Sequence, residues 1–197
     1  MMTKEPQRCH WCNLRNPLYV DYHDHEWGVP EHDDHHLFEL LLLECFQAGL
    51  SWECVLNKRE AFRRAFAGFD PVAVSQFDQT RQEQLAQDAT IIRNRLKIKA
   101  AVTNAQVFLR IQAEYGTFAT YLWGFTNGHT LYETGLATSP LSDLVSRDLY
   151  RRGMRFVGST IVYSYLQAAG IINSHEPGCF LHAKFISANS VSPSEKP

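Results

Sequence analysis

The stretch DATIIRNRLKIKAA, residues 88–101, is the part of the sequence that says most about the fold. It predicts a helix that ends near Ala89, a short basic turn at residues 93–95, and a second helix that begins near Leu96. Two helices joined in this way present consecutive backbone N–H groups at a helix N-terminus, next to positive side chains. The turn is therefore a candidate anion site, and a solvated charged turn is the alternative.

The segments on both sides of this stretch also have helical signals. DDHHLFELLLLECFQAG, residues 33–49, can begin at an aspartate N-cap and stop at its glycine, and Ser51 can cap a following helix that runs to about Phe66. Asp70-Pro71 is typical of a helix start, and residues 80–83 fit a capping box. No segment shows a convincing strand alternation, so we expect an all-α fold.

Composition limits the organisation and the class of protein. The chain has 197 residues, of which 45% are hydrophobic and 12% aromatic, enough for a sizeable core. We expect one globular unit of two closely packed helical lobes over residues 1–183 and a flexible tail over residues 184–197, which is small, polar and proline-containing. A formal net charge of −2 gives the chain as a whole no electrostatic attraction for nucleic acid.

Signals for export or membrane insertion are missing from the sequence. The longest apolar run, LFELLLLECF, is too short and too polar to span a bilayer, and the first residues contain no apolar signal segment. The five cysteines are then expected to be reduced thiols, some of them on a metal. We expect a cytoplasmic protein with no membrane partner, acting as a monomer.

A histidine and a cysteine four residues apart in HEPGC, His175 and Cys179, resemble half of a zinc site. Candidates for the other half lie near the N-terminus, in CHWC and YHDHEWG, and spacing alone favours Cys9 with Cys12. Ordinary thiols and surface histidines are the alternative. A site built from both ends would join the termini, which suggests a structural role for the metal.

The stretch LLLLECFQAGLSWECVL, residues 40–56, carries the clearest sign of chemistry. Glu44 interrupts a strongly apolar run, so its carboxylate must be paired, neutral or open to a ligand, unless it points to water at the helix end. Gly49 permits an unusual backbone or a close approach, and Trp52 follows it. Tyr22 and Trp27, in the segment YHDHEWG, add further aromatic surfaces, and together these residues could form a flat aromatic pocket.

Taken together, the motifs resemble DNA-3-methyladenine glycosylase I, a family of the helix–hairpin–helix superfamily. The resemblance runs from Cys9 to Cys179 and rests on segments that occur in the family's order and spacing. These segments are CHWC, DYHDHEWGVP, ECFQAGLSWECVL, GFDPVAV, DATIIRNRLKIKAAVTNA, YLWGF, RFVGSTIVYSYLQAAGIINSH and PGC.

The resemblance implies an all-α helix–hairpin–helix fold with a structural Zn²⁺ that joins the terminal segments. Its implied metal ligands are Cys9, His23, His175 and Cys179, so that His23 replaces Cys12, the residue that spacing favoured.

The implied activity is base excision repair: hydrolysis of the N-glycosidic bond of N3-methyladenine in alkylated double-stranded DNA. The site residues implied by the resemblance fall into three groups. Catalysis is expected from Glu44 and Tyr22; base binding from Trp52, Tyr22, Glu44, Trp11, Trp27 and Ser164; and DNA binding from Gly49, Leu50, Arg93, Asn94, Arg95 and Lys97. Gly49 and Leu50 match the family's wedge, which fills the gap that an extruded base leaves in the DNA.

The family lacks the aspartate that many of its superfamily use after the hairpin, and we interpret Asp143 as a helix cap. With no lysine in an obvious nucleophile position, we expect a monofunctional enzyme that uses water. Three departures affect the expectation: Cys45 replaces a glycine and could crowd the pocket, and Thr90 and Leu96 stand where several relatives have glycine.

Two other functional classes stay open at this point. A zinc-stabilised helix–hairpin–helix module that binds DNA without cleaving it would need the hairpin and the metal but no pocket. A metal-dependent hydrolase or redox protein would need an open zinc position or a reactive pair formed by Cys9 and Cys12.

Overall fold

The computed structural model describes residues 5–182, and the tail expected at 184–197 lies outside them. Within these residues the chain is mostly helical, as expected. The elements are α1 (Pro17–His25), α2 (Asp34–Gln47), α3 (Trp52–Leu56), α4 (Arg59–Ala65), the 3₁₀ turn η1 (Ala67–Phe69), α5 (Pro71–Ser75), α6 (Gln79–Leu85), α7 (Arg95–Tyr115), α8 (Phe118–Gly124), β1 (Leu131–Tyr132), α9 (Pro140–Arg152), α10 (Ser159–Ala168) and β2 (Ile172–Asn173).

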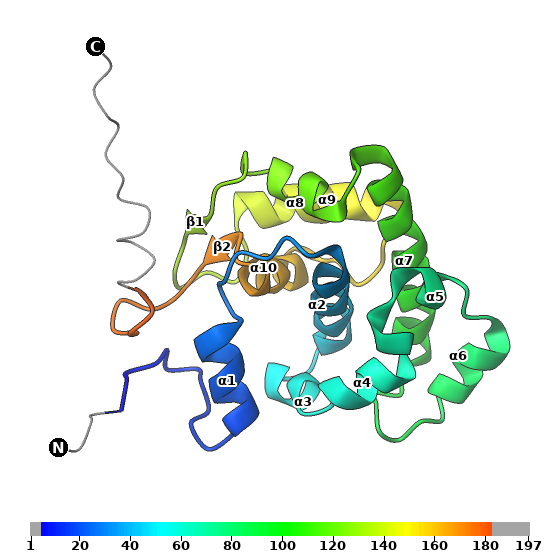
Figure 1. Ribbon diagram of the computed structural model, residues 1–197, viewed down its shortest axis with the longest axis horizontal. Coiled ribbons are helices and arrows are strands. Elements are labelled where there is room, and N and C mark those ends of the chain that lie inside the picture. Colours follow the sequence, from blue (N-terminus) through cyan, green and yellow to red (C-terminus); the bar gives the residue numbers. More distant parts are fainter. Residues whose placement is uncertain (1–4, 183–197) are drawn as a thin grey trace, which may run out of the picture.

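Helix α2 lies in the middle of the molecule, with α10 on one side and α7 on the other (Figure 1). Asp33 caps its N-terminus by accepting a hydrogen bond from the His36 N–H, as the sequence predicts. Ten consecutive residues, 37–46, are buried, because neighbouring elements cover the helix on all sides. The central position of α2 explains why its apolar run is nearly continuous, and it makes Glu44 a carboxylate within the core.

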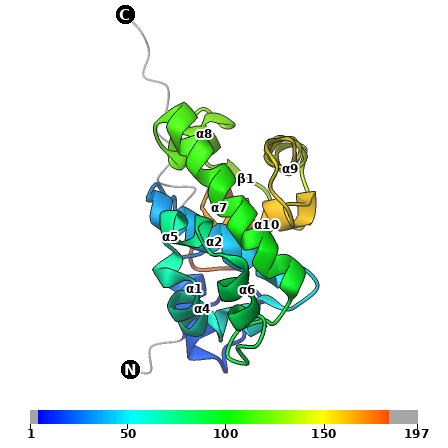
Figure 2. The same cartoon turned by 90° about the vertical axis from the view of Figure 1, so that its right-hand side faces the viewer.

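Helix α7 is the long helix that crosses the molecule beside α5 and α6 (Figure 2). Its N-cap is Asn94, whose side chain accepts hydrogen bonds from the Leu96 and Lys97 N–H groups. The preceding helix α6 ends at Leu85, earlier than the sequence predicts, so the turn between the two helices is longer than expected.

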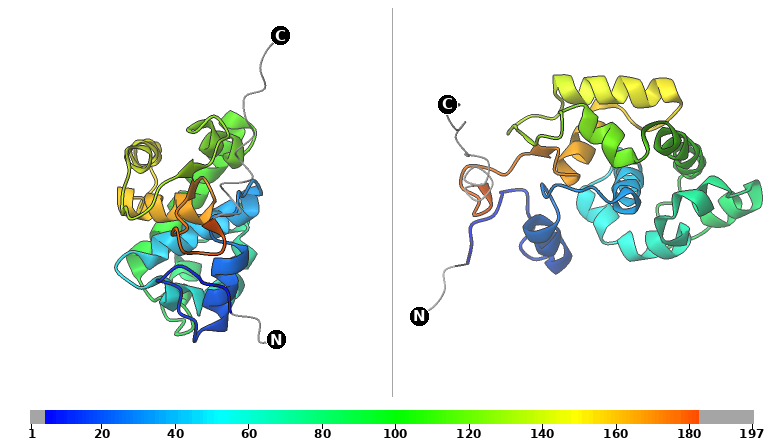
Figure 3. Two further views of the ribbon diagram at one scale, coloured as in Figure 1. Left: turned by 90° about the vertical axis from the view of Figure 1, so that its left-hand side faces the viewer. Right: turned by 45° about the horizontal axis from the view of Figure 1, so that its top comes forward.

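The two terminal segments lie side by side (Figure 3). The Phe180 N–H donates to the Gln7 carbonyl at 2.8 Å across this contact. Nearby, β1 and β2 form a two-stranded parallel pair that the sequence does not predict, with Leu131 opposite Ile172. Strands of two residues are too short to show an alternating pattern.

Three local predictions need correction. The helix expected from Ser51 to Phe66 is broken into α3 and α4. The capping box expected at residues 80–83 is wrong, because Asp78 caps α6. Asp143 lies exposed in the first turn of α9, whereas the N-cap of that helix is Ser139. Within residues 5–182, no helix is long and apolar enough to cross a membrane.

Candidate active site and metal centre

A cavity of about 290 Å³ opens between α1, α2, α3 and α10. All six residues expected to bind the base line it, namely Glu44, Tyr22, Trp52, Trp11, Trp27 and Ser164. They come from segments that are far apart in the chain, and the fold brings them together around one space. No lysine or arginine is among the described residues that line the cavity, whereas two carboxylates, Glu44 and Glu176, are. The cavity therefore favours an aromatic ligand that is neutral or positively charged.

Glu44 is 3% exposed, and its Oε2 atom has no hydrogen-bond partner within residues 5–182. Burial alone raises the pKa of its carboxyl group to about 8, since no cation lies close enough to lower it. The indole Nε1–H of Trp52 is also buried without a partner. Unpaired buried donors and acceptors are costly, so these two groups at the cavity wall indicate a site prepared for a ligand.

Tyrosine and tryptophan rings form a large part of the remaining wall. The rings of Tyr22 and Trp52 have centroids 5.1 Å apart and are tilted by 45°. On another side, Trp11 and Trp27 meet edge to face at 4.7 Å. With Tyr19, five tyrosine and tryptophan rings line this small space and offer flat surfaces on which a planar base can stack.

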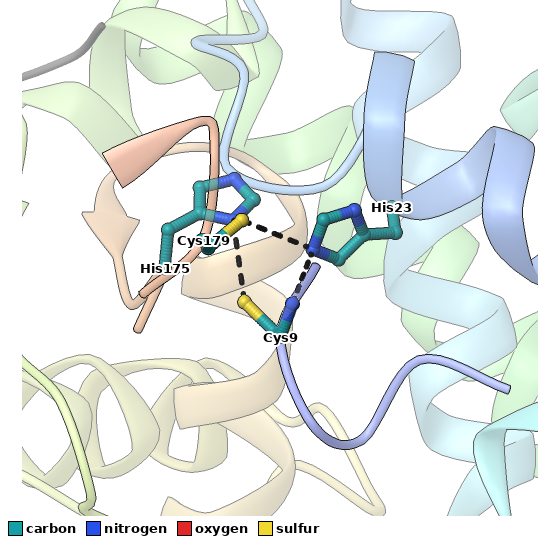
Figure 4. Close-up of side chains that lie close together, drawn as sticks. All are labelled: Cys9, His23, His175 and Cys179. Carbon is teal, nitrogen blue, oxygen red and sulfur yellow. Dashed lines mark hydrogen bonds between the residues drawn. The ribbon is translucent and has the colours of Figure 1, made fainter. Parts of the chain in front are cut away.

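Four side chains from the two ends of the chain converge next to this wall (Figure 4). They are Cys9, His23, His175 and Cys179, all buried, and their ligand atoms lie within 4.8 Å of one another. Cys179 Sγ is 3.6 Å from His23 Nε2 and 3.6 Å from His175 Nδ1, and Cys9 Sγ is 3.5 Å from His175 Nδ1.

These separations fit a tetrahedral metal. Zinc bonds of about 2.3 Å to sulfur and about 2.0–2.1 Å to nitrogen place neighbouring S and N atoms roughly 3.6 Å apart at the tetrahedral angle. The residues present therefore match a closed site of two thiolates and two imidazoles. Cys12 is buried near the Tyr19 carbonyl and is not part of the cluster, which removes the ligand set that spacing favoured.

The two imidazoles are held in the orientation that such a site requires. Asp24 Oδ1 lies 2.7 Å from His23 Nδ1, so Nε2 faces the cluster, and Arg8 in turn pairs with Asp24. His175 Nε2 lies 3.2 Å from the Trp27 carbonyl, which leaves Nδ1 for the cluster. Burial lowers the pKa of His175 to about 4, so its imidazole is neutral and able to ligate.

The residues expected to contact DNA lie on the surface, with one exception. Gly49 has φ +79°, a conformation that favours glycine, and it turns the chain so that the next residue, Leu50, is 42% exposed. Arg93, Asn94 and Arg95 are exposed in the turn before α7. Within residues 5–182, the backbone N–H groups of Ile92, Arg93 and Arg95 have no acceptor.

Lys97 is the exception. Its side chain is buried and donates to the carbonyls of Phe46 at 2.8 Å and Ala48 at 2.6 Å. The expectation that this ammonium group contacts DNA is therefore wrong, because its position in the first turn of α7 faces the end of α2 and not solvent.

The departures from the family pattern do not block the site. Cys45 is absent from the cavity lining and packs instead against Asn104 and the Arg155 carbonyl. Thr90 uses both its N–H and its hydroxyl to bond Asp88 Oδ1, at 2.8 and 2.5 Å, and Leu96 is 70% exposed.

Several residues of the cavity were missed at the sequence level. Gln47 and Gln167 lie one helical turn after Glu44 and Ser164, a spacing that places each pair on one helix face. Glu176 also lines the cavity, and its carboxylate accepts from the His10 N–H at 2.8 Å. The i,i+3 spacing was a signal for the two glutamines, whereas nothing local indicated Glu176.

The chain is similar to characterised proteins over most of its length. A family model described as methyladenine glycosylase matches residues 11–182. The DNA-3-methyladenine glycosylase 1 of Escherichia coli (strain K12) is 46% identical over 180 residues, which cover 88% of this chain and 95% of that protein.

Solved structures agree with this similarity. A crystal structure of 3-methyladenine DNA glycosylase I superposes with a TM-score of 0.86 at 43% identity, covering 89% of this chain and 100% of the other. A second, of a variant of 3-methyladenine DNA glycosylase I in complex with 3-methyladenine, has a TM-score of 0.81 at 36% identity and covers 84% of this chain and 92% of the other.

Proposed function

The chain belongs to the methyladenine glycosylase family, and from this premise we propose that it is a DNA repair enzyme that releases 3-methyladenine from alkylated DNA. The observation that carries the proposal is the buried, unpartnered Glu44 carboxyl at the wall of an aromatic cavity. The relatives named above bear the same activity in their names, and one was solved with 3-methyladenine.

Glu44 gives the cavity its selectivity. Methylation at N3 makes the nucleobase formally cationic, and a cation close to the carboxyl group favours the ionised form and lowers its pKa again. Undamaged adenine carries no such charge. It therefore cannot offset the cost of ionising the buried carboxyl group, or of leaving that group unpaired. Tyr22 and Trp52 stack on the ring, where the attraction is strongest for an electron-poor cation. Trp11, Trp27 and Ser164 complete the wall.

The reaction then needs little acid catalysis, because the methylated base is already a good leaving group. The bond between C1′ and the base nitrogen breaks, and its electron pair goes to the base, which leaves neutral. Water adds to C1′ and loses a proton to solvent, so the products are the free base and an abasic site. Glu44 and Glu176 both line the cavity, and negative charge there favours the positive charge that develops on the sugar.

No lysine lines the cavity among the described residues, and Lys97 is engaged with two carbonyl groups. The described part of the site therefore offers no amine nucleophile, which supports a monofunctional glycosylase with water as the nucleophile.

The DNA would be held by the turn before α7. Helices α6 and α7 with the intervening turn act as the helix–hairpin–helix, and the free N–H groups of Ile92, Arg93 and Arg95 can bind a phosphate. Asn94 caps α7 and so fixes the backbone conformation at the start of this helix. Leu50, on its exposed turn, serves as the wedge. The base must leave the stack to reach the cavity, which costs a few kcal/mol, about the amount that stacking and wedge contacts return.

The four-residue cluster is a structural Zn²⁺ site. Cys9, His23, His175 and Cys179 would supply all four ligands, so no position is left for water or substrate. When bound, the metal neutralises the thiolates and joins the two terminal segments. This closed ligand set argues against a metal-dependent hydrolase, and the prepared cavity argues against a module that only binds DNA. Release of free 3-methyladenine from methylated duplex DNA by the wild type, with far less from Glu44→Ala, tests the proposal.

A further inference from the structure

Lys97 joins the two parts of the surface that would meet DNA. It lies in the first turn of α7, directly after the turn at residues 86–94, and its ammonium group reaches the last carbonyls of α2 and the residue after it. Beyond those carbonyls the chain passes through Gly49 and Leu50 and then enters α3 at Trp52. One side chain thus connects the phosphate-binding turn with the wedge.

The contact is well suited to fix a distance. Lys97 is 6% exposed, so its ammonium group is largely shielded from solvent. Its two acceptors, Phe46 O at 2.8 Å and Ala48 O at 2.6 Å, belong to a helix C-terminus, where a cation is favoured by the free carbonyls and the helix dipole. The ammonium also lies 5.9 Å from the centre of the Phe156 ring. Charge-assisted hydrogen bonds of a buried group are among the stronger single contacts in a protein.

Within residues 48–51 the other described hydrogen bonds of the turn that carries the wedge are local. The Leu50 N–H donates to the Gln47 carbonyl at 2.7 Å, and Ser51 caps α3, but both contacts are local to the turn. Gly49 meets nothing within 4 Å of the position that a side chain would occupy. Lys97 therefore anchors the end of α2, directly before Gly49 and Leu50, to the first turn of α7. A second lysine, Lys58, ties the residues after α3 to the turn before α7, because its Nζ donates to the Thr90 carbonyl at 3.0 Å.

We propose that Lys97 is a positioning residue that keeps the wedge at Leu50 in register with the phosphate-binding turn, so that gripping the DNA and opening the stack occur at one nucleotide. This inference rests on the proposed glycosylase function. It predicts that Lys97 matters for duplex DNA, where a base must be extruded, and not for a base that is already free of the stack.

The test compares Lys97→Met with the wild type in three measurements: single-turnover base release from methylated duplex DNA, the same from methylated single-stranded DNA, and binding of free 3-methyladenine. The methionine keeps a similar stem but donates nothing. We expect duplex release to fall on the order of tenfold or more, as expected for losing charge-assisted hydrogen bonds, while the other two measurements stay close to those of the wild type. Lys99→Met, an exposed lysine on the same helix, is the matched control and leaves the ratio of duplex to single-strand release unchanged.

Two further variants separate positioning from general stability. In a Leu50→Ala background the wedge is gone, so adding Lys97→Met should reduce duplex release little further. Lys97→Arg keeps charged donors and should recover part of the loss of duplex release. The same variant replaces Lys97→Met in the comparison if the methionine variant does not fold. Equal losses on duplex, single strand and free base, or full additivity with Leu50→Ala, would overturn the inference. A wild type that releases no base at all would instead overturn the proposed function.

Discussion

Trp27 stands edge-on to His175, with ring centroids 4.7 Å apart and an interplanar angle of 86°. The same indole lines the cavity, while the same imidazole belongs to the candidate metal cluster. Trp11 also contacts the cluster, with its ring tilted by 59° against that of His23 and the two centroids 5.2 Å apart. The two metal-site histidines therefore support Trp11 and Trp27, two of the three tryptophans that line the cavity, and occupancy of the metal site is expected to affect the base-binding site.

Removal of the metal should consequently change the cavity as well as the stability. Without the cation, the buried thiols and imidazoles lose their common partner, and the terminal segments separate more easily. We expect chelation to lower the melting temperature, to alter tryptophan fluorescence and to weaken binding of free 3-methyladenine.

The matched pair of variants for this prediction is Cys179→Ser against Cys12→Ser. Both thiols are buried near the cluster, but only Cys179 belongs to it. Cys179→Ser should lose the metal, and Cys12→Ser should retain one equivalent. Retention by both variants would show that the ligand set is wrong.

Glu44 should make the protein less stable as the pH rises. Burial raises its pKa from 4.5 to about 8, so between these values the folded protein holds a proton that the unfolded chain has released. The resulting contribution to stability is complete below pH 4.5 and is lost as the pH rises towards 8. In Glu44→Gln this dependence disappears. The free energy of unfolding of the variant relative to the wild type should therefore increase with pH, by at most about 1.4 kcal/mol per unit.

Urea denaturation of both proteins at about pH 5, 6.5 and 8 measures this difference, because these values span the range between the two pKa values. Tyr19→Phe is a useful control, because it alters the cavity wall without removing a carboxyl group. A constant difference between Glu44→Gln and the wild type at the three pH values would mean that Glu44 titrates normally.

Much of this architecture is readable in the sequence because its signals are local. Asp33 and Asn94 are short polar residues directly before apolar helical patterns, and both are N-caps in the structure. A glutamate in the middle of an apolar run, Glu44, was a local signal of the cavity, whose wall it forms. These features depend on neighbours within a few residues, where the chain has little freedom.

Other features depend on contacts between distant segments and could not be predicted in the same way. Spacing favours Cys12 over His23 as a metal ligand, yet the fold turns Cys12 towards the Tyr19 carbonyl. From the sequence, Lys97 is expected to be a surface cation, and only the packing of α2 against α7 brings its ammonium group to the Phe46 carbonyl. The parallel pair of β1 and β2 exists only because the chain returns beside itself after α10.

The turn before α7 should contribute to the salt dependence of DNA binding. Each phosphate contact that is lost reduces the slope of log affinity against log salt by about 0.9. We expect Arg93→Ala and Arg95→Ala each to approach this change for duplex DNA and to leave free-base binding unaltered. Arg64→Ala, an exposed arginine on α4, is the control and should not change the slope. Unchanged slopes in all three variants would place the DNA elsewhere.

The absence of a lysine from the described cavity lining leads to a prediction about the reaction type. Borohydride reduction during turnover should trap no covalent adduct between the protein and methylated DNA, since trapping requires an amine that forms a Schiff base. A bifunctional glycosylase run in parallel verifies that trapping works. A reducible adduct, mapped to any lysine of this chain, would show that water is not the nucleophile.

The most direct test of the account is release of the free base from methylated duplex DNA, with the products separated by chromatography. The wild type should release 3-methyladenine and leave an abasic site. Glu44→Ala should release at least about tenfold less, because it lacks the charged partner of the cationic base. Its fold and metal content, checked by melting and metal analysis, should match the wild type. A metal-loaded, folded wild type that releases no base, or a Glu44→Ala variant as active as the wild type, would contradict the assignment of this cavity.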